Sequence, residues 1–175
     1  MSVKTKADII TSLSLIICSS IVILLPLLSI NNVKVTFIII MLFYMVSNLI
    51  NYLLVKKSKD REGLYTSIVC LISLILANIL NVMENPIYLA FILLIWTFGM
   101  SLVKLKKADY YHDRKNNMWI MHIITLFIFI LIGLLTAVNL YYAAEIQILM
   151  LGNFFFINGI LDLIDPLANL IKEKN

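Results

Sequence analysis

Residues 119–138, WIMHIITLFIFILIGLLTAV, form a run of apolar residues that contains no Lys, Arg, Asp or Glu. At about 1.5 Å per residue, an α-helix of this length covers roughly 30 Å, which matches the hydrocarbon core of a bilayer. A membrane β-strand needs only about 9–11 residues, and these alternate in polarity. The continuous run therefore predicts a membrane-spanning helix.

Five further runs of the same kind lie on both sides of this one, at residues 9–28, 35–55, 64–82, 87–103 and 146–164. Hydrophobic residues make up 62% of the chain and charged residues only 14%. A soluble globular domain has about a quarter of its residues charged, so these values exclude that class. We predict an all-α integral membrane protein with six transmembrane helices in a single domain over residues 1–175.

The basic residues alternate between the connections. Thirteen of the 14 Lys and Arg residues lie before the first run, between the second and third, between the fourth and fifth, or after the sixth. Lys34 alone lies in the other connections. Because basic residues are retained on the cytoplasmic side, both termini are predicted to be cytoplasmic, in a plasma membrane of the bacterial type. The short basic clusters predict contact with anionic phospholipid headgroups rather than nucleic acid.

The three connections on the opposite side are short, at residues 29–32, 83–86 and 139–144. They recur at a nearly constant spacing, which predicts a repeated hairpin. The fourth span is the shortest, and Pro86 is expected to serve as its first helical residue, where its missing N–H costs nothing. We therefore expect three tandem helical hairpins.

Two motifs resemble the HdeD-like family of acid-resistance membrane proteins. These are Pro26 within ILLPL at residues 23–27 and Gly159 within GILDL at residues 159–163. The chain departs from the family in having only 5 glycines. The resemblance implies six helices in three hairpins and a non-enzymatic role in stress or acid resistance. It supplies no catalytic residues.

Three polar residues, Asn158, Asp162 and Asp165, are spaced i, i+4 and i+7 and therefore share one face of the sixth helix. Such a stripe is costly against lipid and should turn inward or toward water. One interpretation is that the two carboxylates reach the headgroups and pair with lysines of residues 104–107 or with Lys172. The other is a vestibule facing the cytoplasm that takes up a proton or cation. The bond between Asp165 and Pro166 disfavours helical continuation, which favours an interfacial position.

The deepest amides are Asn48, Asn51 and Asn153, which we expect to be buried. They suit hydrogen bonds between helices and also suit a polar solute. His122 is expected to stay wetted near the cytoplasmic interface, and Asp8 to cap the first helix. Homo-oligomerisation remains open.

No motif for an enzyme is found, because the sequence lacks a phosphate-binding Gly-rich loop, a His-Glu-x-x-His helix and a Gly-x-Ser-x-Gly turn. Cys18 and Cys70 have no second ligand at metal-binding spacing. We therefore expect no catalytic residues, cofactor or metal. The alternative function is a small-solute transporter or the six-helix substrate-binding subunit of a vitamin importer.

Overall fold

The structure is a computed structural model that describes residues 3–55, 61–80 and 86–174, with the side chains of 86 and 172–174 left aside. All regular elements in these ranges are helical, which confirms the predicted class. The elements are α1 (Val3–Leu24), a short 3-10 helix η1 (Leu25–Leu28), α2 (Val33–Val55), α3 (Glu62–Ile79), α4 (Pro86–Asp113), α5 (Met118–Asn139) and α6 (Ala144–Lys174). Over the described residues, six helices are long and apolar enough to cross a membrane.

The outer surface of the bundle is apolar along its length. Large side chains such as Leu24, Phe98 and Phe127 are more than half exposed. Inside, Trp96, Phe155 and other large side chains are fully buried. A soluble protein rarely exposes a continuous apolar surface of this extent, whereas a bilayer accommodates it.

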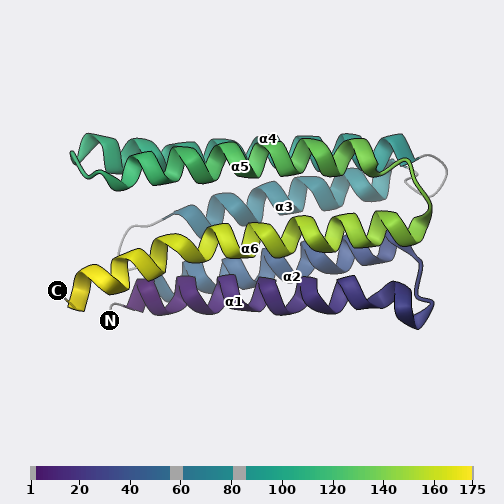
Figure 1. The fold of residues 1–175 in the computed structure, drawn as a ribbon, viewed down its shortest axis with the longest axis horizontal. Coiled ribbons are helices and arrows are strands. Elements are labelled where there is room, and N and C mark those ends of the chain that lie inside the picture. Colours follow the sequence, from purple (N-terminus) through teal and green to yellow (C-terminus); the bar gives the residue numbers. More distant parts are fainter. Residues whose placement is uncertain (1–2, 56–60, 81–85, 175) are drawn as a thin grey trace.

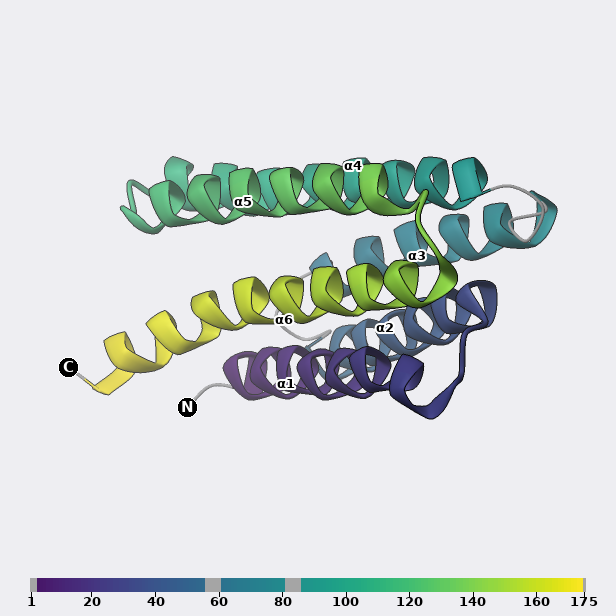
Figure 2. The same ribbon diagram turned by 45° about the vertical axis from the view of Figure 1, so that its right-hand side comes forward.

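The six helices lie lengthwise in one bundle, with the start of α1 and the end of α6 at the same end (Figure 1). The most extensive helix contacts join α1 to α6, α4 to α5, and α2 to α3. Figure 2 shows α4 and α5 side by side and set apart from α6. The partners within each expected hairpin, α1 with α2, α3 with α4, and α5 with α6, also touch but less extensively. Of the three most extensive contacts, only that of α1 with α6 joins segments distant in the chain, and the other two join consecutive helices across the connections at the end with both termini.

Two glycines allow the close contact between α1 and α6. A Cβ atom at Gly152 would lie 2.7 Å from Ile23 Cγ1, and one at Gly159 would lie 2.7 Å from Ile16 Cγ1. The two glycines are seven residues apart and therefore lie on the same face of α6. The missing side chains let α1 approach the backbone of α6, as small residues do between membrane helices.

Two helices are longer than the sequence predicted. α4 was expected to end at Val103, but it continues to Asp113 and spans 28 residues, about 42 Å. α6 was expected to end at Ile164, but it continues through Pro166 to Lys174. The inference that Pro166 marks the end of the helix was therefore wrong. Neighbouring contacts can hold a helix through a proline when they satisfy the freed backbone groups.

Several features of the predicted topology fall outside the described residues. These are Lys56, Lys57 and Lys59 and most of the turn at residues 83–86, together with the side chains of Lys172 and Lys174.

Candidate functional site

Charged side chains meet between the helices at the end of the bundle that carries both chain termini. Lys104 and Lys107 lie one turn apart on α4, in the segment predicted to be a loop. Lys104 forms an ion pair with Asp162 of α6, and Lys107 Nζ lies 2.9 Å from Asp165 Oδ2. The pairing that the first interpretation of the stripe expected is thus present with Lys104 and Lys107. It occurs between two helices and not at a wetted loop.

Lys107 also lies between two carboxylates. Its Nζ atom is 3.0 Å from Glu62 Oε2, at the first turn of α3. The side chain of Asp165 is 6% exposed and that of Lys107 is 18% exposed. A single ammonium group therefore links α3, α4 and α6, and it does so largely out of water.

Asp165 also contacts polar side chains of α4, α5 and α6. Tyr111 donates its hydroxyl to Asp165 Oδ1 at 3.3 Å, and Asn169 donates Nδ2 to the same oxygen at 3.3 Å. His122 Nε2 lies 3.4 Å from Oδ1, within ion-pair reach but without a well-aligned hydrogen bond. The ring of His122 stacks on Tyr111 at 4.8 Å between centroids.

The expectation of a wetted His122 was wrong, because this residue is 8% exposed. Its burial follows from the extended α4. The extra turns of that helix place Tyr111 over the imidazole ring.

Asp162 lies at the edge of a more open region. Its Oδ2 atom accepts a hydrogen bond from Tyr44 at 3.0 Å and another from Asn158 Nδ2 at 3.3 Å. The Asp162 side chain is 25% exposed, whereas Asn158 is 1% exposed. Asn158 Oδ1 is buried and has no hydrogen-bond partner among the described residues. The structure thus brings Asn158 and Asp162 together, with Asp165 one turn further along α6.

The predicted deep amides separate into different environments. Asn48 is buried and donates Nδ2 to the backbone carbonyl of Tyr44 at 2.9 Å. Asn51 is half-buried and joins α2 to α1 by donating Nδ2 to Asp8 Oδ1 at 2.9 Å. Asn153 was expected to be buried, but it lies exposed on α6. The sequence placed Asn153 near the middle of the span. It did not show which face of α6 packs against the other helices.

The sequence suggested that Asp8 caps α1, and this prediction was wrong. The helix begins at Val3, so Asp8 lies in its second turn. Its side chain instead contacts α2 through Asn51. Its position on the same helical face as Ser12, a small residue, was the signal for a helix contact.

A polar cavity of about 60 Å³ lies beside these groups, between α1, α2, α3, α4 and α6. This volume holds a few water molecules, at about 15 Å³ each. Both charge signs line it, because Asp8, Glu62 and Asp162 face Lys104 and Lys107. The remaining lining residues are Thr11, Ser12, Tyr44, Asn48, Asn51, Tyr52, Val55, Gly63, Thr66, Met100 and Val103.

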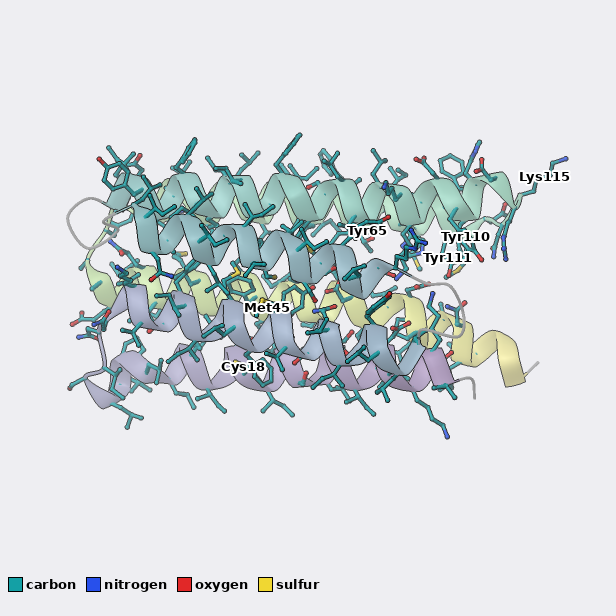
Figure 3. The ribbon with its side chains drawn as sticks, turned by 180° about the vertical axis from the view of Figure 1, so that it is seen from behind. Cys18, Met45, Tyr65, Tyr110, Tyr111 and Lys115 are labelled. Atoms are coloured by element: carbon teal, nitrogen blue, oxygen red, sulfur yellow. The ribbon has the colours of Figure 1, made fainter. Side chains whose placement is uncertain are left out.

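Toward the middle of the bundle, the cavity gives way to packed aromatic rings. Trp96 is fully buried and lies edge-on to Tyr44, Phe129, Phe154 and Phe155, with ring centroids 5.2–6.0 Å apart. Its Nε1 atom points to Cys70 Sγ at 3.4 Å. Figure 3 shows Tyr65, Tyr110 and Tyr111 toward the end with both termini, and Met45 and Cys18 nearer the middle. The ion pairs and the polar cavity described above therefore lie toward the end of the bundle with both termini.

The cavity and its surroundings contain ion-paired Lys, Asp and Glu side chains together with neutral hydroxyl and amide groups. Over residues 3–55, 61–80 and 86–174, no group of three or more His, Cys, Asp or Glu side chains could hold a metal ion. Comparison of the chain with family models, curated proteins and solved structures finds no match. The site and the fold are therefore the basis for the proposed function.

Proposed function

We propose that this chain is a multi-pass integral protein of a bacterial-type plasma membrane with both termini in the cytoplasm. Six apolar helices support the insertion. The start of α1 and the end of α6 share one end of the bundle (Figure 1). Lys104 and Lys107 lie toward that end, and Lys115 lies at it (Figure 3), whereas Lys34 is the second residue of α2, at the other end. The positive-inside rule then favours the termini facing the cytoplasm.

Reporter fusions test the orientation. Alkaline phosphatase, which is active only outside the cytoplasm, is fused after Met83 in one chain and after Lys57 in another. The first fusion should be active and the second inactive, while a cytoplasmic reporter at the same two sites should give the opposite pattern. Activity after Lys57 and none after Met83 would overturn the orientation.

For the activity, we propose a non-enzymatic protein of the stress or acid-resistance type, which the resemblance to HdeD-like proteins suggested. The supporting observation is that Lys104 and Lys107 form ion pairs with carboxylates on other helices. Lys107 connects Glu62 of α3 with Asp165 of α6, and Lys104 pairs with Asp162. Such pairs fix the mutual position of helices, and the protein then acts through its presence and packing in the membrane.

A deletion strain tests this role. The strain should lose survival under acid shock and regain it when the intact gene is returned, whereas growth under vitamin limitation should be unaffected. Unchanged survival after acid shock would contradict the proposal. A defect confined to vitamin limitation would support an importer subunit instead.

The second candidate is a small-solute transporter, and the polar cavity is the observation that favours it. The cavity adjoins Asp162, the more exposed carboxylate of the stripe. In proteoliposomes, a transporter would move a solute or protons, and Asp162→Asn should abolish that flux while leaving protein abundance unchanged. The matched control is Asp109→Asn, because Asp109 is an exposed acid on α4. Equal flux in the Asp162→Asn and Asp109→Asn variants would show that Asp162 is not needed for transport.

A further inference from the structure

The face of α6 that points away from the bundle carries a regular seven-residue pattern. Exposed positions recur along it every seven residues, and the positions three residues after each of them are half-buried. The exposed set is Ile146, Asn153, Ile160 and Leu167, and the half-buried set is Leu149, Phe156, Leu163 and Leu170. Glu145 and Ile171, near the two ends of the helix, are exposed as well. In heptad notation the first set occupies position a and the second occupies position d.

The three-residue spacing between the two sets matches the a and d positions through which two parallel helices pack against each other. The positions four residues after the exposed ones are half-buried too, at Met150, Ile157 and Ile164. Isoleucine at a with leucine at d favours a parallel pair, and one asparagine at an a position fixes the register of that pair. Here two of the a positions are isoleucine and one is Asn153, while three of the d positions are leucine. The opposite face of α6, with Ile148, Leu151 and Phe155, is buried in the bundle. The heptad seam is therefore left free by the fold.

Asn153 separates this face from an ordinary lipid-facing surface. It is the tenth residue of α6, about 14 Å along the helix axis from Ala144 and thus near the middle of a core of about 30 Å. Its Nδ2 atom donates to Leu149 O at 2.8 Å, which leaves one N–H and the amide oxygen free to bond a partner outside the chain. On the other five helices, the exposed residues at mid-span are apolar wherever the structure describes them.

We propose that α6 is the interface of a parallel homodimer in which Asn153 of one copy hydrogen-bonds Asn153 of the other. A carboxamide both donates and accepts, so the two amides satisfy each other about a two-fold axis. All copies with the same topology present α6 in the same direction, so the axis runs along the membrane normal. The inference rests on the proposed membrane insertion, because only a lipid surrounding makes the free amide costly.

The test uses the full chain in liposomes and measures the monomer–dimer equilibrium by single-molecule photobleaching. Asn153→Leu should lower the dimer association constant by about eight- to three-hundredfold, the range that two symmetric interhelical hydrogen bonds in a bilayer give. The control is Asn139→Leu, because Asn139 donates to Leu135 O in the same way but lies at the last turn of α5. That variant should leave the equilibrium unchanged.

A second measurement maps the interface directly. Ile146→Cys, near the outer end of α6, should form an intermolecular disulfide under mild oxidation, because a positions lie close to the dimer axis. Val138→Cys is the control at a similar depth on α5, and the unmodified chain with Cys18 and Cys70 gives the background. Equal cross-linking of Ile146→Cys and Val138→Cys would overturn the proposed interface.

The same membranes are extracted with alkaline carbonate to measure insertion separately. A chain that resists extraction yet stays monomeric, or that dimerises equally well after Asn153→Leu, would refute the dimer while leaving the membrane proposal intact. A chain released by carbonate would refute the membrane proposal itself.

Discussion

Replacing Lys107 by methionine tests whether the buried ion pairs hold the bundle together. Methionine keeps most of the length of the side chain but removes the ammonium group that lies 2.9 Å from Asp165 and 3.0 Å from Glu62. Asp165 is 4% exposed and would be left without this partner. Breaking a buried pair in this way typically costs about 3–5 kcal/mol, and the partial exposure of Lys107 favours the lower value.

The expected cost can be read as a shift in melting temperature. For a protein of this size, about 1 kcal/mol corresponds to roughly 2–4 °C, so about 3 kcal/mol gives a loss of roughly 6–12 °C. The assay is thermal unfolding of the purified protein in detergent, followed by tryptophan fluorescence. Trp96 lies in the core of the bundle and should report the loss of packing.

The neighbouring residue supplies the matched control. Lys106→Met removes a charge from the same turn of α4, but Lys106 is exposed and lies over the Tyr65 ring at 4.7 Å. An exposed contact of this kind is worth about 0.5–1 kcal/mol, so its shift should be a few degrees at most. The double variant Lys107→Met, Asp165→Leu should regain part of the loss, because it removes the buried carboxylate together with the ammonium group, whereas the remaining Glu62 side chain is 34% exposed and can be solvated. Equal melting temperatures for the two lysine variants, or no recovery in the double variant, would refute the reasoning.

Three further substitutions have outcomes fixed by local geometry. Asp162→Asn should cost only about 1 kcal/mol in a thermal melt, since this side chain is 25% exposed and largely screened; a loss comparable to that of Lys107→Met would contradict it. Gly63→Ala should destabilise by about 1–3 kcal/mol, because a Cβ atom there would lie 2.5 Å from the backbone oxygen of Asn48; an unchanged or higher melting temperature would count against this close contact. Trp96→Ala should cost about 3–5 kcal/mol, as for a fully buried aromatic residue, whereas Phe98→Ala, at a 68% exposed site on the same helix, should have little effect; similar losses in both would show that the aromatic cluster is not the core.

The sequence alone was sufficient for the six long helices, although it did not predict the short helix η1 (Leu25–Leu28). A run of about 20 apolar residues is a local property, and in lipid its backbone must satisfy its own hydrogen bonds, so each run predicts one helix. The alternating basic connections likewise predict the orientation without knowledge of the packing.

The sequence was less informative where polar residues belong to a helix. The segment at residues 104–113 contains charged residues and was predicted to be a loop, yet it completes α4. Its helical form depends on partners from other elements, such as Glu62 for Lys107 and Asp165 for Tyr111. Hydropathy measures the preference of a residue for lipid, and it cannot report an ion pair formed with a distant segment.

Which face of each helix is buried was decided only by the tertiary structure. Asn153 and Asn158 lie five residues apart on α6, so their side chains point about 140° away from each other, and Asn153 is exposed whereas Asn158 is 1% exposed. In a soluble protein the polar face of a helix marks its outside, but in a membrane both the core and the lipid are apolar, so this signal is weak. The close contact of α1 with α6 at Gly152 and Gly159 fixes the rotation of α6. That rotation turns Asp165 toward Lys107 and leaves Asn153 on the outer surface.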